Sequence, residues 1–571
     1  MLNYNGADIT RDIIGYEDPF HFKQIEKGNG WISDELKLEM DTWDCALPGL
    51  KQPVLINAPT GRGKSTFVLK ELARKAKNQG KCVILLTNRF ALNLQQKMIL
   101  TRKNGEQIYG SGALSDVIKI DNIFVLTYQE LFSLYGNYRK IDHLYLNYGA
   151  NKQIGFLVFD EVHFFLADAA FNADKQKIYD ELLAKFYTTK RIYLSATPED
   201  VKALISYKET ALYKIYSNSC DYHQISAMLA NYKTIVEYKF STDYSHVHLS
   251  FFRKWEDIIL KCNSDNEKWL IFVSKKETGR ELKSRIKNAE FIDSSAKDTS
   301  IGEFNDLVIN EMFECKVLIS TAVLDNGINF DDSQLKHIVI DSVDRTQILQ
   351  MLGRKRRSND EIVNLYVMHK DRGDIDRYYS SAVKKAKLLE EFKRDPRSCI
   401  NSHLGEFEKN EQNLFSMDSA RRIYINEFAV LYLDQQMGFY QTLKRKFVRE
   451  GEFAFSKQVC SWFNIPFHEE MYLEDLKKKL CKKLDDSLQK YIGESPLEED
   501  SLSKLNDELV KMIAPFKEDI DIRPDRKKTN INNIIKYFSL PYECKKANKQ
   551  HSIIRTDVTM DGEQAVENTE L

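Results

Sequence analysis

Short apolar runs alternate with amphipathic stretches between residues 53 and 200. We predict buried strands at 54–56, 82–86, 123–126, 156–159 and 191–194. Between the first two runs, residues 65–79 carry apolar side chains at helical spacing and stop at Gly80, as expected of a helix that covers a sheet. Strands that alternate with such helices predict an α/β domain with a parallel sheet.

The alternation weakens between about 205 and 255 and resumes with apolar runs at 269–273, 316–320 and 337–341, which predicts a second α/β unit. After about 395 the pattern becomes mostly helical, which predicts a mainly helical C-terminal accessory domain. The predicted divisions are an N-terminal segment 1–45, a first α/β domain 46–215, a connection 216–250, a second α/β domain 251–395, the helical domain 396–556 and an acidic tail 557–571.

Composition narrows the class of protein. The 571 residues include 83 Lys and Arg against 84 Asp and Glu, so the chain is not a strongly cationic carrier of polynucleotide. This balance does not exclude a local basic groove that binds nucleic acid. The apolar runs are far shorter than the roughly 18 residues that cross a bilayer, and the N-terminus does not resemble a secretory signal. Nine cysteines without a Cys-x-x-Cys pair indicate reduced thiols. We therefore expect a cytoplasmic enzyme without a membrane partner.

A phosphate-binding loop is the strongest chemical signal. The sequence Ala-Pro-Thr-Gly-Arg-Gly-Lys-Ser-Thr at 58–66 follows a predicted strand directly and opens a predicted helix. In this setting backbone N–H groups surround a phosphate, a lysine reaches the β and γ phosphates, and a hydroxyl ligates Mg²⁺. Ala58 departs from the usual glycine at the first position, and the alternative is a plain glycine-containing turn. The predicted nucleotide-binding residues are Thr60, Gly61, Gly63, Lys64, Ser65 and Thr66, with Ser65 as a metal ligand.

Two adjacent carboxylates follow the apolar run at 156–159. Asp160 can hold the Mg²⁺ shell as a nucleotide-binding and metal residue, while Glu161 can act as the catalytic base that polarises the attacking water. Alone, acids after a strand usually begin a polar loop. Paired with a phosphate loop they predict a site for ATP and Mg²⁺.

The order of these motifs resembles a known family. Asp-Glu-Val-His at 160–163, followed by Ser-Ala-Thr-Pro at 195–198, looks like the superfamily 2 helicases of the DEAD/DEAH-box group, in a DEVH form. Segments at 87–92, 126–130, 319–329 and 350–357 look like further members of the ordered motif set. The resemblance implies two RecA-like domains in tandem, with ATP and Mg²⁺ bound in the cleft between them.

The resemblance also implies roles for residues outside the phosphate loop. It makes Gly327 a nucleotide-binding residue and assigns nucleic-acid contact or coupling to Arg89, Thr127, Ser195, Thr197 and Thr321. For these residues an ordinary capping or turn role is the alternative. Their places at strand ends, where α/β sheets present ligands, favour contact with a phosphodiester backbone.

The segment 350–357 has a physical rationale of its own. Guanidinium groups delivered from a second domain can stabilise the charge that develops on a transferred phosphoryl group. The family likeness makes Arg354 and Arg357 catalytic arginine fingers and Gln350 a residue that positions water or γ-phosphate. Arg356 stands where the family usually has Gly, and the alternative for the whole run is a solvated basic patch.

The predicted function is an ATP-dependent nucleic-acid helicase or translocase, with DNA favoured over RNA by family analogy alone. Two alternatives stay open. One is an ATP-switched nucleic-acid sensor or clamp that does not unwind, and the other is the motor subunit of a nuclease complex. A protein partner bound through the C-terminal domain also stays open.

Overall fold

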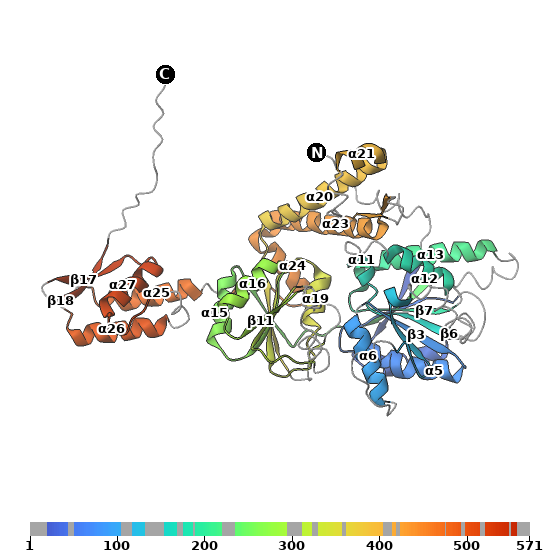
Figure 1. Ribbon diagram of the computed structural model, residues 1–571, viewed down its shortest axis with the longest axis horizontal. Helices are drawn as coiled ribbons and strands as arrows, with labels where there is room; N and C mark the ends of the chain where they lie inside the picture. The colour runs from blue at the N-terminus through green and yellow to red at the C-terminus, as the bar shows by residue number, and fades with distance from the viewer. Residues whose placement is uncertain are drawn as a thin grey trace, which may run out of the picture.

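A computed structural model of the 571-residue chain gives the architecture. The description covers residues 20–43, 51–88, 90–103, 117–131, 154–167, 175–186, 189–219, 234–293, 311–321, 329–356, 361–403, 414–417, 423–473, 476–492, 497–513, 520–547 and 550–556. Two α/β domains lie side by side, helices α20, α21 and α23 lie along them, and a small lobe extends beyond the second domain (Figure 1).

The first domain is built on an eight-stranded sheet of order β1-β8-β2-β7-β6-β3-β5-β4. Every neighbouring pair is parallel except β4 and β5 at one edge. The strands are β1 (His21–Lys27), β2 (Val54–Asn57), β3 (Cys82–Thr87), β4 (Lys119–Ile120), β5 (Ile123–Thr127), β6 (Ile154–Phe159), β7 (Lys190–Ser195) and β8 (Thr234–Phe240).

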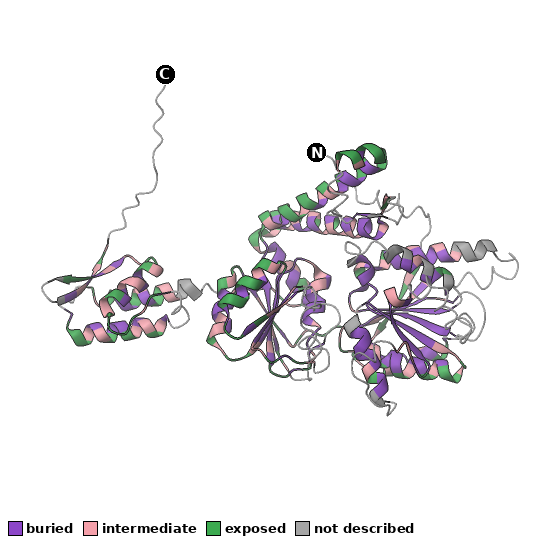
Figure 2. Ribbon diagram, viewed as in Figure 1, coloured by how far each residue is buried: buried purple, intermediate pink, exposed green. Residues whose placement is uncertain are grey.

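Helices cover both faces of this sheet. A continuous helical rod made of α4, the π-helical stretch η1 and α5 packs on one face together with α2 and α3, and α11, α12 and α13 lie towards the other. The bounds are α2 (Ile32–Glu35), α3 (Lys37–Asp41), α4 (Lys64–Thr66), η1 (Phe67–Leu72), α5 (Ala73–Asn78), α6 (Phe90–Lys103), α11 (Phe164–Ala167), α12 (Lys175–Lys185), η3 (Pro198–Asp200) and α13 (Lys202–Ser219). The central strands are buried on both faces (Figure 2), which explains their continuous apolar runs.

The second domain has a six-stranded sheet of order β11-β12-β10-β13-β14-β9, parallel throughout. Its strands are β9 (Val247–Phe252), β10 (Lys268–Phe272), β11 (Ala289–Ile292), β12 (Val317–Ser320), β13 (Leu335–Ile340) and β14 (Val363–Met368). Its helices are α15 (Trp255–Ser264), α16 (Lys276–Arg285) and α19 (Arg345–Leu352). The predicted fold class is confirmed: two RecA-like parallel-sheet domains in tandem precede a mainly helical C-terminal region.

Two segments that the sequence analysis set apart from the first domain contribute strands to its sheet. Strand β1 lies in the predicted N-terminal segment 1–45, and β8 lies in the predicted connection 216–250, yet β1 pairs with β8 and β8 pairs with β2. Strand β1 was missed because its exposed and half-buried residues alternate, so it lacks the apolar run of a central strand. Likewise β9 begins at Val247, inside the predicted connection.

The region after the second sheet forms two separate bodies rather than one helical domain. The first consists of α20 (Arg372–Arg394), α21 (Pro396–Ser402), β15 (Phe415–Met417), β16 (Ile423–Ile425), α23 (Glu427–Glu450), η4 (Gly451–Phe453), α24 (Ala454–Phe463) and η5 (Glu469–Met471). The second is a lobe of α25 (Leu476–Gln489), α26 (Glu499–Met512), α27 (Lys527–Tyr537) and the hairpin β17 (Tyr542–Ala547) and β18 (Gln550–Arg555). The lobe has its own core, which Leu260 of α15 joins.

Helix α23 belongs to the cores of both α/β domains. Near its N-terminal end, the Phe428 ring packs edge-on against the rings of Phe165 and Tyr179 in the first domain. Towards its C-terminal end, Leu443 and Phe447 lie in the core that contains the second sheet. The helix therefore bridges the two domains through buried apolar contacts.

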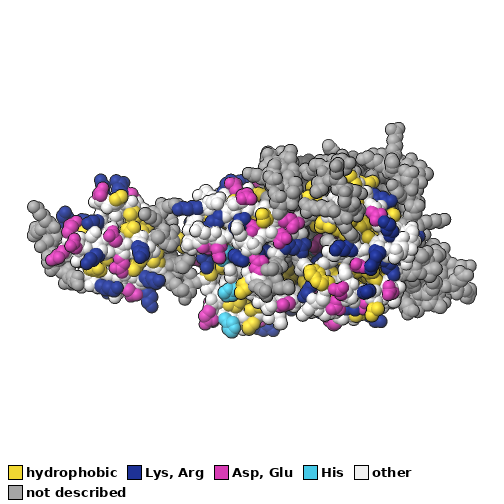
Figure 3. Space-filling model, turned by 90° about the horizontal axis from the view of Figure 1, so that it is seen from below, with side chains coloured by type: hydrophobic (Ala, Val, Ile, Leu, Met, Phe, Trp, Pro, Cys, Tyr) yellow, Lys and Arg dark blue, Asp and Glu magenta, His cyan; other side chains and the backbone are white. Residues whose placement is uncertain are grey.

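Surface character agrees with the balanced composition. Among the described residues, no helix is both long enough and apolar enough to cross a membrane. On the face seen in Figure 3, basic and acidic side chains are interspersed over the described surface. An anion bound on the described part of this face would therefore be held by individually placed cations and not by a broad basic field.

Replacing Lys190 with Met should stabilise the first domain at neutral pH. Lys190 is buried at the start of β7 with its ammonium 5.5 Å from the ring centre of Trp43, and burial, aided by Arg191 and Lys51, lowers its pKa to about 7. The unfolded chain binds the proton up to the ordinary pKa of 10.5, so stability should rise between about pH 7 and 10.5. We expect K190M to raise the free energy of unfolding at pH 7 by about 1–3 kcal/mol.

Thermal unfolding at pH 7 and pH 9 measures this effect. The advantage of K190M over the unsubstituted protein should shrink at pH 9, and the exposed Lys77→Met variant should show no such pH-dependent gain. An equal stability difference at both pH values would contradict the titration of Lys190.

Candidate nucleotide site between the two α/β domains

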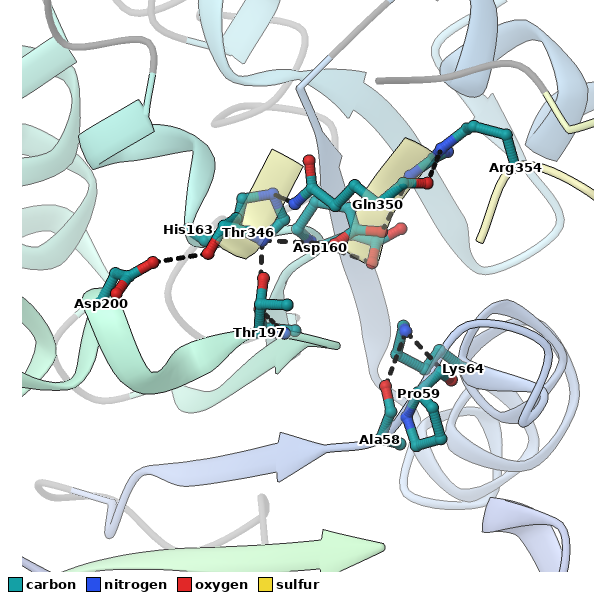
Figure 4. A network of polar contacts seen from close by, with 12 residues as sticks. Ala58, Pro59, Lys64, Asp160, His163, Thr197, Asp200, Thr346, Gln350 and Arg354 are labelled. Atoms are coloured by element: carbon teal, nitrogen blue, oxygen red, sulfur yellow. Dashed lines mark hydrogen bonds and ion pairs between the residues drawn. The ribbon is translucent and has the colours of Figure 1, made fainter. Parts of the chain in front are cut away.

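The predicted phosphate loop lies between β2 and α4. Gly61 and Gly63 have φ values of +85° and +80°, a conformation that favours glycine. The buried Lys64 ammonium donates to the carbonyl oxygens of Ala58 at 2.9 Å and Pro59 at 3.4 Å (Figure 4). Burial lowers the pKa of Lys64, while Glu161 and Asp160 act in the opposite direction. The loop thus holds its lysine at the start of a helix, where backbone N–H groups are free to meet a phosphate.

The remaining loop residues are accessible or engaged by neighbours. Ser65 Oγ accepts a hydrogen bond of 2.8 Å from Nε2 of Gln96 on α6, and Thr66 is exposed. Thr60 faces the second domain, because a Cβ on Gly353 would lie 2.5 Å from Thr60 Oγ1. The phosphate loop and the end of α19 are therefore in direct contact.

The acidic pair follows β6, at the same sheet edge as the phosphate loop. The backbone N–H of Asp160 donates to the Leu86 carbonyl at 2.9 Å, and the Tyr128 hydroxyl donates to the Asp160 carbonyl at 2.7 Å. Glu161 has a φ of +50°, a left-handed conformation that a residue with a side chain adopts at an energetic cost. The surrounding contacts fix this turn and hold both carboxylates in the buried cleft.

The pKa values of the two carboxylates are shifted in opposite directions. Burial, together with the neighbouring Glu161 charge, raises the pKa of Asp160 to about 7. Burial also disfavours the Glu161 carboxylate, but the nearby Lys64 and Arg354 charges hold its pKa below the usual value. Glu161 Oε2 lies 3.4 Å from His163 Nδ1 and accepts no hydrogen bond from any residue that the structure describes. Glu161 is therefore ionised at neutral pH, and Oε2 is available to take a proton from water.

Asp160 and Ser65 fit the chemistry of a magnesium site. Carboxylate and hydroxyl oxygens are suitable Mg²⁺ ligands, usually completed by water and substrate phosphates. The raised pKa of Asp160 shows that its buried carboxylate is not fully compensated by the cations of the chain. A divalent cation would relieve that cost.

Helix α19 carries the second domain's contribution. Its N-cap residue Asp344 accepts from the backbone N–H of Gln347 at 2.9 Å, and the helix buries Gln350. The Gln350 amide contacts Nε2 of His163 (Figure 4). Arg354 Nη2 lies 3.9 Å from Glu161 Oε1. The structure thus brings Arg354 to the predicted base Glu161 and Gln350 to the neighbouring His163, across the boundary between the domains.

His163 joins three of the sequence motifs. Its Nδ1 lies 3.1 Å from Ser195 Oγ, and that oxygen accepts a hydrogen bond of 3.0 Å from the backbone N–H of Thr197. On the other side its Nε2 meets Gln350. Burial lowers the pKa of His163, so the ring is neutral near pH 7. One ring nitrogen contacts Ser195 of the first domain and the other contacts Gln350 of the second, so His163 connects the two domains.

Thr127 and Thr321, both predicted to contact nucleic acid, follow strands of different sheets and have different surroundings. The Thr127 hydroxyl accepts from the backbone N–H of Glu130 at 3.1 Å, and Glu130 Oε2 accepts from the backbone N–H of Thr127 at 2.6 Å, so Thr127 caps the turn after β5. Thr321 follows β12 at the carboxyl edge of the second sheet and is half-buried. Arg89, Gly327 and Arg357 lie outside the described residues.

Several residues of the site were absent from the sequence-based set. Gln96 meets Ser65, and His163 links the motifs; His163 could have been found from its place in the acidic motif. Trp31 is 60% exposed and lies against the phosphate loop, where a Cβ on Gly63 would be 3.1 Å from its ring. Nothing in the sequence pattern connects Trp31 to the loop, because the contact depends on the fold of the N-terminal segment.

Part of the chain, within the first α/β domain, matches a known protein family. Residues 32–200 match the family described as "Type III restriction enzyme, res subunit". This match covers the phosphate loop, the acidic pair and the Ser195–Thr197 segment, and it ends before the second α/β domain.

Solved structures with some similarity include a helicase and two proteins bound to RNA. The Mycobacterium smegmatis helicase Lhr bound to ssDNA and AMP-PNP is 17% identical, with a TM-score of 0.38, over 57% of this chain and 45% of its own. S. cerevisiae Dbp5 bound to RNA and ADP BeF3 is 15% identical, with a TM-score of 0.34, over 64% and 83% of the two chains. Mss116p bound to ssRNA and AMP-PNP is 15% identical, with a TM-score of 0.40, over 78% and 100%.

These likenesses are distant. The chain spans less than half the length of Lhr, and no curated protein matches it significantly. Similarity at this level does not identify a substrate.

Proposed function

We propose that the protein is an ATP-hydrolysing nucleic-acid motor of the superfamily 2 helicase type. The observation that carries the proposal is the meeting of Arg354 and Gln350 from one domain with Glu161 and His163 of the other, beside a phosphate loop. A site divided between two domains is completed only when they are together, so ATP binding and hydrolysis can be linked to domain movement.

Each described residue has a chemical role in this proposal. Lys64 and the loop N–H groups bind the β and γ phosphates of ATP, and Glu161 takes the proton of the attacking water. Gln350 orients water or γ-phosphate, and Arg354 stabilises the charge that develops on the transferred group. Ser65 and Asp160 hold Mg²⁺, which neutralises phosphate charge when bound.

The hydrogen-bonded path through His163 offers a route for coupling. Loss of the γ-phosphate would release Gln350 and thereby change the contacts of His163 with Ser195 and Thr197. Arg89 and Thr321 are proposed to contact the nucleic-acid backbone from the two domains. Thr127 is proposed to support that surface by capping and not by direct contact.

DNA is the proposed substrate, in preference to RNA. The support is the match of residues 32–200 to a family named for a restriction-enzyme subunit, together with the Thr-Tyr form of residues 127–128. The same match favours a second candidate, in which the chain is the motor subunit of a nuclease complex.

ATP hydrolysis measured with single- and double-stranded DNA and RNA at one fixed salt concentration tests the proposal. We expect basal hydrolysis to rise with DNA, and the rise to weaken with added salt because phosphate contacts dominate such binding. Absence of hydrolysis under all these conditions would contradict the proposed function.

Strand displacement on a tailed duplex separates the remaining alternatives. Displacement or directional movement that requires ATP supports a helicase or translocase. Stimulated hydrolysis without either supports an ATP-switched clamp. Cutting by the isolated chain would contradict the motor assignment.

A further inference from the structure

Arg356 lies beside the phosphate loop. The residue is half-buried, and its Nη1 lies 3.9 Å from the position that a Cβ on Gly61 would take. The neighbouring Gly353 packs against Thr60. The chain just after α19 is therefore held against the loop that would surround the phosphates.

The backbone fixes the direction of the side chains after α19. The N–H of Arg356 donates to the Phe330 carbonyl at 2.7 Å, and the N–H of Phe330 donates to the Arg354 carbonyl at 2.7 Å. Between the two arginines, Lys355 has a different environment: its ammonium donates to the Asp332 carbonyl at 3.0 Å and pairs with Glu361 at 2.8 Å. Phe330 and Lys355 form a short β-bridge, and successive side chains of such extended backbone point to opposite sides. The side chains of Arg354 and Arg356 therefore point towards the cleft, and that of Lys355 points into the second domain.

Arg356 has no matching anion within the described part of the chain. Its guanidinium forms no hydrogen bond or ion pair with any described residue, whereas Arg354 lies near Glu161. Burial and repulsion from Arg354 lower the pKa of Arg356, and Glu311 and Glu161 only partly oppose this. A half-buried cation without a partner is costly, and an anionic ligand would offset that cost.

The charges of the cleft also call for an anion. Lys64, Arg354 and Arg356 face Asp160 and Glu161. The three cations of the cleft therefore outnumber its two carboxylates. A ligand phosphate of high negative charge would complete the balance.

We propose that Arg356 binds the terminal phosphate of ATP from the second domain, in addition to Arg354. The inference rests on the proposed function, since it takes ATP as the ligand of this site. The helicases that the chain resembles usually have Gly at this position, so the contact is a property of this chain. Arg356 holds the phosphate in place while Glu161 and Arg354 act on the reacting atoms.

The test compares Arg356→Gly and Arg356→Lys with the unsubstituted protein. Equilibrium binding of Mg-AMP-PNP and Mg-ADP and the steady-state rate of ATP hydrolysis are measured in the full chain. We expect R356G to lose about 10- to 100-fold in AMP-PNP affinity and hydrolysis while ADP affinity stays within about threefold. R356K should recover part of the loss, because lysine retains the charge but not the planar fork.

Arg280→Ala, on an exposed arginine of the same domain, is the matched control and should leave all three quantities unchanged. Circular dichroism melting establishes that each variant is folded; if R356G does not fold, R356K decides the outcome by its own AMP-PNP to ADP ratio. Unchanged AMP-PNP affinity and hydrolysis would overturn the inference, as would an equal loss of ADP affinity. If the unsubstituted protein neither binds nor hydrolyses ATP, the proposed function itself fails, whereas hydrolysis that is insensitive to Arg356 overturns this inference alone.

Discussion

Replacing Glu161 with Gln is expected to reduce ATP hydrolysis by about 10²- to 10⁴-fold while ATP binding persists. The carboxylate lies 3.9 Å from Arg354, and Glu161 Oε2 accepts no hydrogen bond from the described residues. The neighbouring cations keep the group ionised at neutral pH despite its burial. Glutamine preserves the size of the side chain but cannot take a proton from water. The loss should therefore fall on kcat.

Single-turnover hydrolysis and equilibrium AMP-PNP binding separate these effects. Glu71→Gln is the control, because the half-buried Glu71 lies on η1 and pairs with the exposed Arg74, and this variant should hydrolyse ATP normally. A Glu161→Gln protein with the rate of the unsubstituted enzyme would remove Glu161 as the base. Loss of AMP-PNP binding in the Glu161→Gln protein would show that Glu161 acts in ligand binding and not as the base.

Replacing Arg354 with Ala is expected to lower kcat by about 10³-fold. The guanidinium is buried, and its Nε donates to the Gln350 carbonyl at 3.2 Å, which positions it near Glu161. A positioned cation stabilises developing charge without reorganisation during the reaction. Because this charge is greatest in the transition state, kcat should fall much more than ATP affinity.

The comparison of kcat with the AMP-PNP dissociation constant tests the role of Arg354. Arg354→Lys should remain far below the unsubstituted enzyme, since a lysine lacks the planar fork. A loss confined to affinity would contradict a transition-state role. Melting curves for both variants are needed, because Arg354 is buried and faces Glu161.

The parallel cores and the nucleotide site were predictable because their signals are local. Central parallel strands are buried on both faces and therefore produce continuous apolar runs, as in β2, β3 and β6. The phosphate loop and acidic pair lie at strand ends, so the parallel sheet itself brings Lys64 close to Asp160 and Glu161.

The features missed by the sequence depend on packing between distant segments. Strand β1 is an edge strand of mixed polarity, and its partner β8 is more than 200 residues away. Trp31 reaches the loop only because the N-terminal segment joins the first domain. Thr127 fits either a capping or a ligand role in the sequence, and the structure shows its capping hydrogen bonds with Glu130, which the sequence pattern alone does not reveal.

The bridging helix α23 limits how the two domains can separate. Its 24 residues form a rod of about 36 Å at 1.5 Å per residue, anchored in a different core towards each end. The chain also crosses directly between the domains from β8 to β9. The domains are therefore joined at two places, by the short β8–β9 connection and by a helix packed into both cores. We expect a rotation that keeps both attachments intact to cost less than a translation that would pull α23 out of either core.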